Sequence, residues 1–273
     1  MDGYHIDKFG HSLKKGRDGR DGLLSLIKWF GPLVDEWWKR IELCSFYFDT
    51  PRSGLIFREK QAVGLKNFAS GHNANAQTVV EKLEKILLSG KYALTFTKSE
   101  YMIYGVDFCY PDNWRTIIVL SFFVNEYSHS SQTICANEKQ QRGITLEGHD
   151  LLIWNSSSTN IKVPYKARAW NIVYIAWNTG SQSHYSINDI SGSFKTLPAS
   201  EYVSNFLYLG CNGDREGHRK NFFSGKIARF DLYTSERTDE ELPTVLKNLL
   251  LKTHRDIVPD DDDGFRDGAE CLE

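Results

Sequence analysis

The sequence of 273 residues lacks the short motifs that mark common catalytic and metal sites. It contains no Gly-x-Ser-x-Gly nucleophile motif, no His-Glu-x-x-His zinc motif and no Cys-x-x-Cys pair. Its five cysteines are widely spaced along the chain. This spacing suits free thiols in a reducing compartment, or at most two disulfides with Cys271 left over. The motifs therefore give no support for a zinc site.

The sequence also lacks long apolar runs and a strong net charge. No run of about 18 apolar residues exists, and the first twenty residues carry charges without an apolar core. We therefore expect no membrane span and no signal peptide, so that the protein is cytoplasmic at synthesis. A role outside the cell or on a particle surface, by a non-classical route, stays open. The net charge of −2 and the absence of a basic stripe argue against nucleic acid as a partner.

Aromatic residues are abundant instead: 13 Tyr, 16 Phe and 7 Trp. Aromatic and β-branched residues favour strands. Many short period-two segments separated by polar turns predict a mainly β sandwich or jelly roll over residues 44–252. The clearest expected strands are the continuous apolar runs at residues 116–124 and 169–177. We also expect a hairpin over residues 92–106, an internal helix over residues 75–90 and a short closing helix over residues 239–251.

Residues 1–22 carry a collagen-like repeat, Gly16-Arg-Asp-Gly19-Arg-Asp-Gly22. Glycine at every third place suits the crowded axis of a triple helix, but three triplets are too few to hold one. Two interpretations stay open, a flexible charged linker and the remnant of a stalk. At the other end, residues 253–273 hold eight acids against two bases and predict a disordered acidic tail.

Residues 23–43 predict an N-terminal amphipathic helical segment. Large apolar residues recur at alternating steps of three and four, which is the spacing of a helix–helix seam. The segment is a candidate trimerisation collar, a helix docked on its own β-domain, or a helix at a membrane surface. The residues expected to carry self-association are Ile27, Phe30, Val34, Trp37 and Ile41.

Three segments of the last half resemble a known fold family. They are Trp170-Asn-Ile-Val-Tyr-Ile-Ala-Trp177, Phe206-Leu-Tyr-Leu-Gly210, and Phe223-Ser-Gly225-Lys-Ile-Ala-Arg-Phe. Together they resemble the strands of concanavalin-A-like jelly rolls of the laminin-G and pentraxin kind. The resemblance implies two antiparallel sheets with binding loops at the rim, and ligands that are glycans or proteins, often bound with calcium. In the last segment, Ile227 and Phe230 break strict alternation by one place, which predicts a β-bulge.

Glycan binding needs an exposed aromatic ring with polar groups beside it. Three loops offer such groups. Each loop can also be interpreted as a plain turn, and Trp154 can also be interpreted as a core residue. Calcium needs six or more oxygens, and the acids in these loops are too isolated to supply them, so no metal or other cofactor is expected. The candidate ligand-binding residues are Trp154, Asn155, Trp114, Asp112, Asn212, Asp214 and Arg219.

Catalysis finds little support in the sequence. A glycosidase on a jelly roll needs two carboxylates that face one groove. Acids occur at strand-like positions, but none forms a pair on one strand; they are Asp107, Glu126, Glu147 and Asp231. We therefore expect a non-enzymatic, lectin- or adhesion-like module that recognises a glycan or protein and is compatible with a homotrimer. The alternatives are a structural or coat-like protein without ligand, and a degenerate glycoside hydrolase.

Overall fold

The computed structural model describes the chain in segments, most of them strands. The described residues are 5–6, 12–13, 42–48, 54–58, 61–65, 74–76, 83–85, 90–97, 101–108, 114–137, 142–155, 160–178, 181–196, 204–213, 218–236 and 244–258. Among them the chain is mainly β, with antiparallel strand pairing in two large sheets. The mainly β sandwich expected from the sequence is confirmed.

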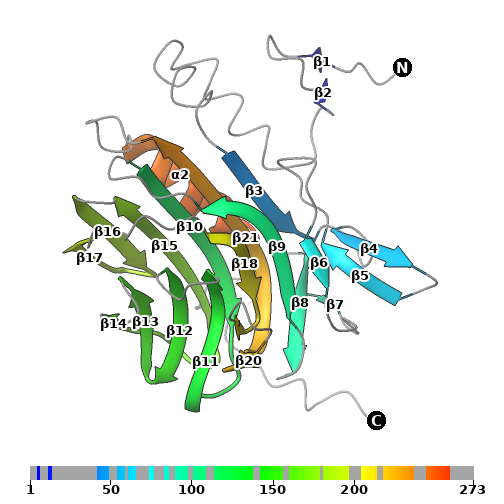
Figure 1. Cartoon of the computed structure of the whole chain (residues 1–273), viewed down its shortest axis with the longest axis horizontal. Helices are drawn as coiled ribbons and strands as arrows, with labels where there is room; N and C mark the ends of the chain where they lie inside the picture. The colour runs from blue at the N-terminus through cyan, green and yellow to red at the C-terminus, as the bar shows by residue number, and fades with distance from the viewer. Residues whose placement is uncertain are drawn as a thin grey trace, which may run out of the picture.

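The first large sheet has eight strands in the order β17-β16-β15-β10-β21-β8-β7, with β3 also paired to β21 (Figure 1). β21 pairs with both β8 and β3 along the same edge, because β8 pairs with the start of β21 and β3 pairs with a later part of it. The strands are β3 (Glu42–Tyr47), β7 (Leu83–Lys85), β8 (Tyr92–Thr97), β10 (Trp114–Phe123), β15 (Trp170–Asn178), β16 (Gln182–Ile187), β17 (Ile190–Lys195) and β21 (Ser224–Glu236).

The second large sheet has nine strands in the order β14-β13-β12-β11-β18-β9-β6-β5-β4. Two small pairs, β1 (His5–Ile6) with β2 (Ser12–Leu13) and β19 (Asn212–Gly213) with β20 (Arg219–Lys220), form separate two-stranded sheets. The nine strands are β4 (Leu55–Arg58), β5 (Gln61–Leu65), β6 (Ala74–Ala76), β9 (Met102–Phe108), β11 (Ser128–Asn137), β12 (Gly143–Gly148), β13 (Asp150–Trp154), β14 (Asn160–Pro164) and β18 (Ser204–Leu209).

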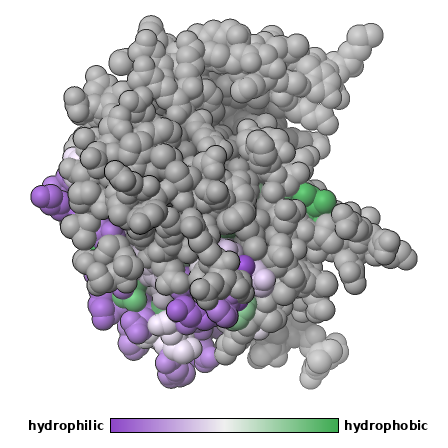
Figure 2. All heavy atoms as spheres, viewed as in Figure 1, coloured by the Kyte–Doolittle hydropathy of each residue, from purple (hydrophilic) through white to green (hydrophobic). Residues whose placement is uncertain are grey.

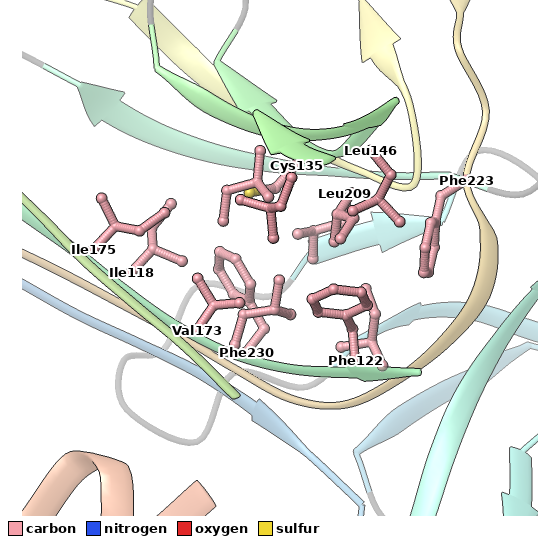
Figure 3. Close-up of a cluster of buried hydrophobic side chains, with 14 of the residues drawn as sticks. Ile118, Phe122, Cys135, Leu146, Val173, Ile175, Leu209, Phe223 and Phe230 are labelled. Carbon is pink, nitrogen blue, oxygen red and sulfur yellow. The ribbon is translucent and has the colours of Figure 1, made fainter. Parts of the chain in front are cut away.

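The main core lies between the two sheets (Figure 3). One sheet contributes Ile118, Phe122 and Phe230, and the other contributes side chains such as Leu146 and Leu209, all almost fully buried. Because alternate residues of a strand point to opposite faces, this core takes every second residue of the long strands. The buried runs that the sequence shows at residues 116–124 and 169–177 are therefore β10 and β15.

The β-bulge predicted near the start of β21 is confirmed. Ser121 pairs with Arg229 while Phe122 pairs with Ile227, so Ala228 is the extra residue. The insertion shifts the alternation by one place, which lets both Ile227 and Phe230 face the main core.

A C-terminal helix, α2 (Thr244–Arg255), covers the outer face of the first sheet. In Figure 3 this helix lies on the side of the sheet away from the core. Leu250 and Leu251 pack there on Ile117, Val119 and other side chains of β10 and β15. The short closing helix is confirmed, but it begins at Thr244, directly after Pro243, rather than at 239.

Two local predictions from the sequence are wrong. The helix expected over residues 75–90 is replaced, in its described parts, by β6 and β7, and β7 pairs with β8 through Leu83 and Leu94. Cross-strand pairing has overridden a helical spacing of apolar residues. The hairpin expected over residues 92–106 is also absent, because β8 belongs to the first sheet and β9 to the second.

The domain limits expected at both ends shift by a few residues. β3 begins at Glu42, inside the expected collar, whose other residues from 23 to 41 lie outside the described part of the chain. The expected tail begins too early, because α2 runs to Arg255 and Ile257 is buried. None of the helical residues that the structure describes forms a segment long and apolar enough to cross a membrane.

Candidate functional site

A buried chain of hydrogen bonds links α2 to the first sheet. Nδ1 of His254 lies 2.6 Å from the hydroxyl of Ser121 on β10, and Nε2 lies 3.0 Å from Oδ2 of Asp231 on β21. An ionised carboxylate can only accept, so Nε2 carries the proton and donates to Asp231. The neutral ring then accepts the Ser121 hydroxyl at Nδ1. This Ser–His–Asp order resembles a catalytic triad, but with the two ring nitrogens exchanged, since in the serine-protease triad Nε2 faces the serine.

Two further groups complete the cluster around Asp231. Nε of Arg229 donates to Oδ2 of Asp231 at 2.7 Å, and the Ser45 hydroxyl donates to Oδ1. Burial raises the pKa of Asp231, but the charge of Arg229 and the hydrogen bonds from His254 and Ser45 outweigh it and hold the pKa at about 2. Burial lowers the pKa of His254 more than the bond to Asp231 raises it. The cluster therefore holds a neutral imidazole beside an ion pair.

The buried position of this cluster indicates that it holds α2 on the first sheet and does not act as a reaction centre. Ser121 and His254 are 0 % exposed and Asp231 is 1 % exposed, because α2 lies directly over them. A nucleophile must come within bonding reach of a substrate atom, and a hydroxyl sealed under a helix cannot do so. Fully satisfied buried networks of this kind fix one arrangement of the elements they join.

The cluster predicts a loss of stability in acid. The unfolded chain takes up a proton on His254 near pH 6.5, whereas the folded chain resists it, so the unfolding free energy falls as the pH drops below 6.5. A second loss follows between the ordinary Asp value of 3.8 and the folded value of about 2. Urea unfolding from pH 8 to pH 4 measures the first step. The His254→Gln variant should lack its share of that step; an identical pH profile would contradict the assignment.

An exposed aromatic surface lies where β12 turns into β13. The Tyr127 ring contacts the imidazole of His149 in a tilted arrangement, with centroids 4.0 Å apart and planes at 51°, and meets the Tyr165 ring edge to face at 5.4 Å. Tyr127 is 37 % exposed, and His149 is exposed as well. We call these three residues the tyrosine platform. Tyr165 is buried in the main core, so the platform has a fixed base.

Hydrogen bonds tie together the three loops that carry the platform. The Tyr165 hydroxyl donates to the Gly148 carbonyl at 3.0 Å and accepts from the Ser128 amide at 3.4 Å. The backbone amide of Arg168 donates to the Val124 carbonyl at 2.8 Å, and Arg168 itself has a φ of 60°. The loops at residues 124–128, 148–149 and 165–168 therefore form one preformed surface.

The surroundings of the platform are polar. Asn125, Glu126 and His129 are exposed beside Tyr127 in the sequence. Figure 2 shows hydrophilic side chains gathered at the lower left of the described surface, where Figure 1 places β11 to β14. An exposed ring rimmed by hydrogen-bonding groups can cover the apolar face of a sugar while its neighbours bond the hydroxyls.

Trp154 and Asn155, two of the predicted site residues, lie at the opposite end of β13 from the platform. Trp154 is 9 % exposed and packs against Leu152 and Ala136, while its carbonyl accepts from the Trp177 indole at 2.9 Å. The side-chain amide of Asn155 donates from Nδ2 to the Lys195 backbone carbonyl at 2.8 Å. Both residues therefore contribute to packing and strand-end bonding where they stand.

Asn212 and Arg219 are neighbours in the small β19–β20 pair, but their side chains lie on opposite faces. Arg219 is opposite Gly213, and Asn212 is opposite Lys220. The Arg219 guanidinium lies 4.6 Å from the centre of the Tyr208 ring. A Cβ on Gly213 would come within 2.9 Å of the same ring, so this face of the pair is seated closely on Tyr208.

The remaining predicted residues are not brought into either site by the described part of the chain. Trp114 is the first residue of β10, where Arg115 bonds to Asn178, while Asp112 and Asp214 lie outside the described residues. No three His, Cys, Asp or Glu side chains come together as a metal site in the parts of the chain described. The thiols of Cys135 and Cys211 are free, and burial raises the pKa of each to about 12.

Sequence reasoning missed the tyrosine platform and the His254 cluster. A weak signal existed for the first, since Asn125-Glu126-Tyr127 places a large ring in a polar turn after a long buried strand. For the second, Asp231 was visible as an acid on a strand. Its partners Ser45 and His254 lie 186 and 23 residues away, however, and no spacing rule connects them.

Comparisons with known proteins show the fold. No family model and no curated protein matches the sequence. Among solved structures, a Trypanosoma rangeli sialidase mutant with trans-sialidase activity has a TM-score of 0.55 at 9 % identity. The sialidase in complex with sialic acid gives 0.52 at 10 % identity, and each match covers 80 % of this chain and 34 % of the sialidase. A chain of botulinum neurotoxin type C has a TM-score of 0.49 at 14 % identity, over 76 % of this chain and 52 % of the toxin chain. The chain thus spans about a third of the sialidases, with which it shares a β-sandwich.

Proposed function

We propose that this chain is a non-enzymatic recognition module that binds a glycan at the tyrosine platform. The carrying observation is the exposed Tyr127 ring, held by His149 and Tyr165 on loops that are tied to one another. Because the ring is already fixed, a sugar can stack on it without ordering the loops first. Asn125, Glu126 and His149 supply donors and acceptors for hydroxyl groups.

Two further observations support this proposal. The Ser–His–Asp chain that would suggest hydrolysis is sealed under α2, which favours binding over catalysis. The segments that carry the resemblance to concanavalin-A-like and laminin-G-like domains are β15, β18 and β21, which supports placing the sandwich in that group. A sialidase of similar fold is described in complex with sialic acid, and a sugar ligand is compatible with that likeness.

Removing the ring is expected to abolish most of the binding. Once a glycan array has identified a ligand, Tyr127→Ala should weaken its affinity about tenfold or more, since ~1.4 kcal/mol corresponds to a factor of ten. Tyr127→Phe keeps the ring and should bind within about twofold of the native chain. Lys162→Ala, an exposed change on β14, controls for unspecific effects. Titration calorimetry of the four chains measures the affinities.

The outcomes separate the site from the function. A glycan that binds Tyr127→Ala normally would leave the function standing and move the site elsewhere. An array without any bound glycan would overturn the function and favour a protein ligand or a purely structural role. Release of sugar from a fluorogenic glycoside by the purified chain would contradict the non-enzymatic assignment.

A further inference from the structure

β17 forms an open edge of the first sheet. Among the described strands it has a neighbour on one side only, β16. Edge strands usually carry a charge, a proline or a bulge in their middle, which prevents pairing with another chain. The middle of β17 reads Ser191-Gly192-Ser193 and pairs with β16 without a bulge. Ser191 and Ser193 are exposed, and so is Ile190 at 43 %.

The hydrogen-bond pattern shows which backbone groups face outward. The Thr196 amide donates to the Ser181 carbonyl at 3.1 Å, so residue 196 bonds toward β16. In an antiparallel pair this direction alternates, so residues 190, 192 and 194 also face β16. The amides and carbonyls of Ser191 and Ser193 therefore point away from the sheet. The Lys195 carbonyl also points outward, where it accepts from Asn155.

We propose that β17 pairs in antiparallel fashion with β17 of a second copy of this chain and joins two first sheets edge to edge. Outward-facing residues must pair with outward-facing residues, which allows a small set of registers. In the register centred on Gly192, Ser191 pairs with Ser193 of the second copy. The same register places Ile190 opposite Phe194, and it brings Asp189, in the turn just before β17, beside Lys195, twice each by symmetry.

This register is self-complementary in charge and in apolar contact. Asp189 and Lys195 are exposed and of opposite sign; Lys195 lies on one face of the strand pair, and Asp189 lies in the turn that precedes β17. Ile190 and Phe194 lie on the other face, so the exposed Ile190 gains an apolar neighbour. Gly192, which has no side chain, lies at the two-fold axis, where the strands approach most closely.

Charge reversal tests the pairing in the full chain. We expect sedimentation at high micromolar concentration to show a weak dimer, since a single strand pair buries a small interface. Asp189→Lys and Lys195→Asp should each weaken association about tenfold or more and run as monomers. An equimolar mixture of these two variants restores both ion pairs and should dimerise, as should the double variant. Both positions are exposed, so the variants should fold normally, and circular dichroism checks this.

The proposal would be overturned by a monomeric native chain, by a dimer insensitive to both reversals, or by a mixture of the two variants that stays monomeric. A trimer insensitive to the reversals would also overturn it, and would point instead to the collar predicted over residues 23–43.

Discussion

Replacing Asp231 by alanine is expected to lower the unfolding free energy by about 3–5 kcal/mol, because it leaves the largely buried Arg229 charge, whose side chain is 12 % exposed, without its carboxylate. His254 loses its acceptor in the same change. For a domain of this size, 1 kcal/mol corresponds to about 2–4 °C, so the melting temperature should fall by about 6–20 °C. Calorimetry and urea unfolding at pH 7.5 measure the two quantities.

Matched variants separate the charge pair from burial in general. Glu147→Ala removes an exposed acid from β12 and should change the unfolding free energy by about 0.5 kcal/mol or less. Ser45→Ala removes one hydrogen bond to the same carboxylate and should cost about 1 kcal/mol. The double variant Arg229→Met with Asp231→Leu removes both charges and should recover part of the loss. If Asp231→Ala costs under about 1 kcal/mol, the cluster does not hold α2.

The strands that the sequence predicts well are those whose pattern is set within the strand itself. β10 and β15 are buried on both faces, between the main core on one side and α2 on the other, and so read as continuous apolar runs. The bulge in β21 was also predictable, since an extra residue shifts the alternation of buried side chains between Ile227 and Phe230.

The elements that the sequence mispredicts depend on partners far along the chain. Residues 83–85 join β8 as a strand although their apolar spacing suits a helix, because pairing with Leu94 decides between the two. β8 and β9 look like a hairpin because they follow each other closely, yet they enter different sheets. Short apolar segments do not encode the sheet to which they belong.

The candidate site residues were also hard to predict, because their exposure depends on contacts with residues far along the chain. Trp154 beside a polar loop has the sequence appearance of a sugar-binding ring, but Leu152 and Ala136 pack on it. Tyr127 has a similar sequence context, but its ring stays exposed, and it packs against the rings of His149 and Tyr165 in the neighbouring loops. Exposure follows from what folds over a residue, which single-sequence patterns leave undetermined.

Truncation of the chain near the end of α2 is the second change expected to lower the unfolding free energy strongly. A chain that stops after Lys252 loses His254, the hydrogen-bond partner of Ser121 and Asp231, and Ile257, which packs on Ala93 and Ala228. Burial of one large aliphatic side chain contributes about 1.5–3 kcal/mol. Unsatisfied buried polar groups cost about 1–3 kcal/mol more. We therefore expect the unfolding free energy to fall by about 3–5 kcal/mol.

A chain that stops after Val258 is the matched control. It keeps the whole of α2 and Ile257 and removes only an acidic segment that contains four consecutive aspartates. Its melting temperature should stay within about 2 °C of the native value. Urea unfolding of the two truncated chains and the native chain compares the three stabilities. Equal stability of all three would show that the first sheet does not need the end of α2. A large loss in both truncated chains would show that residues after 258 stabilise the sandwich, so that its boundary lies beyond the helix.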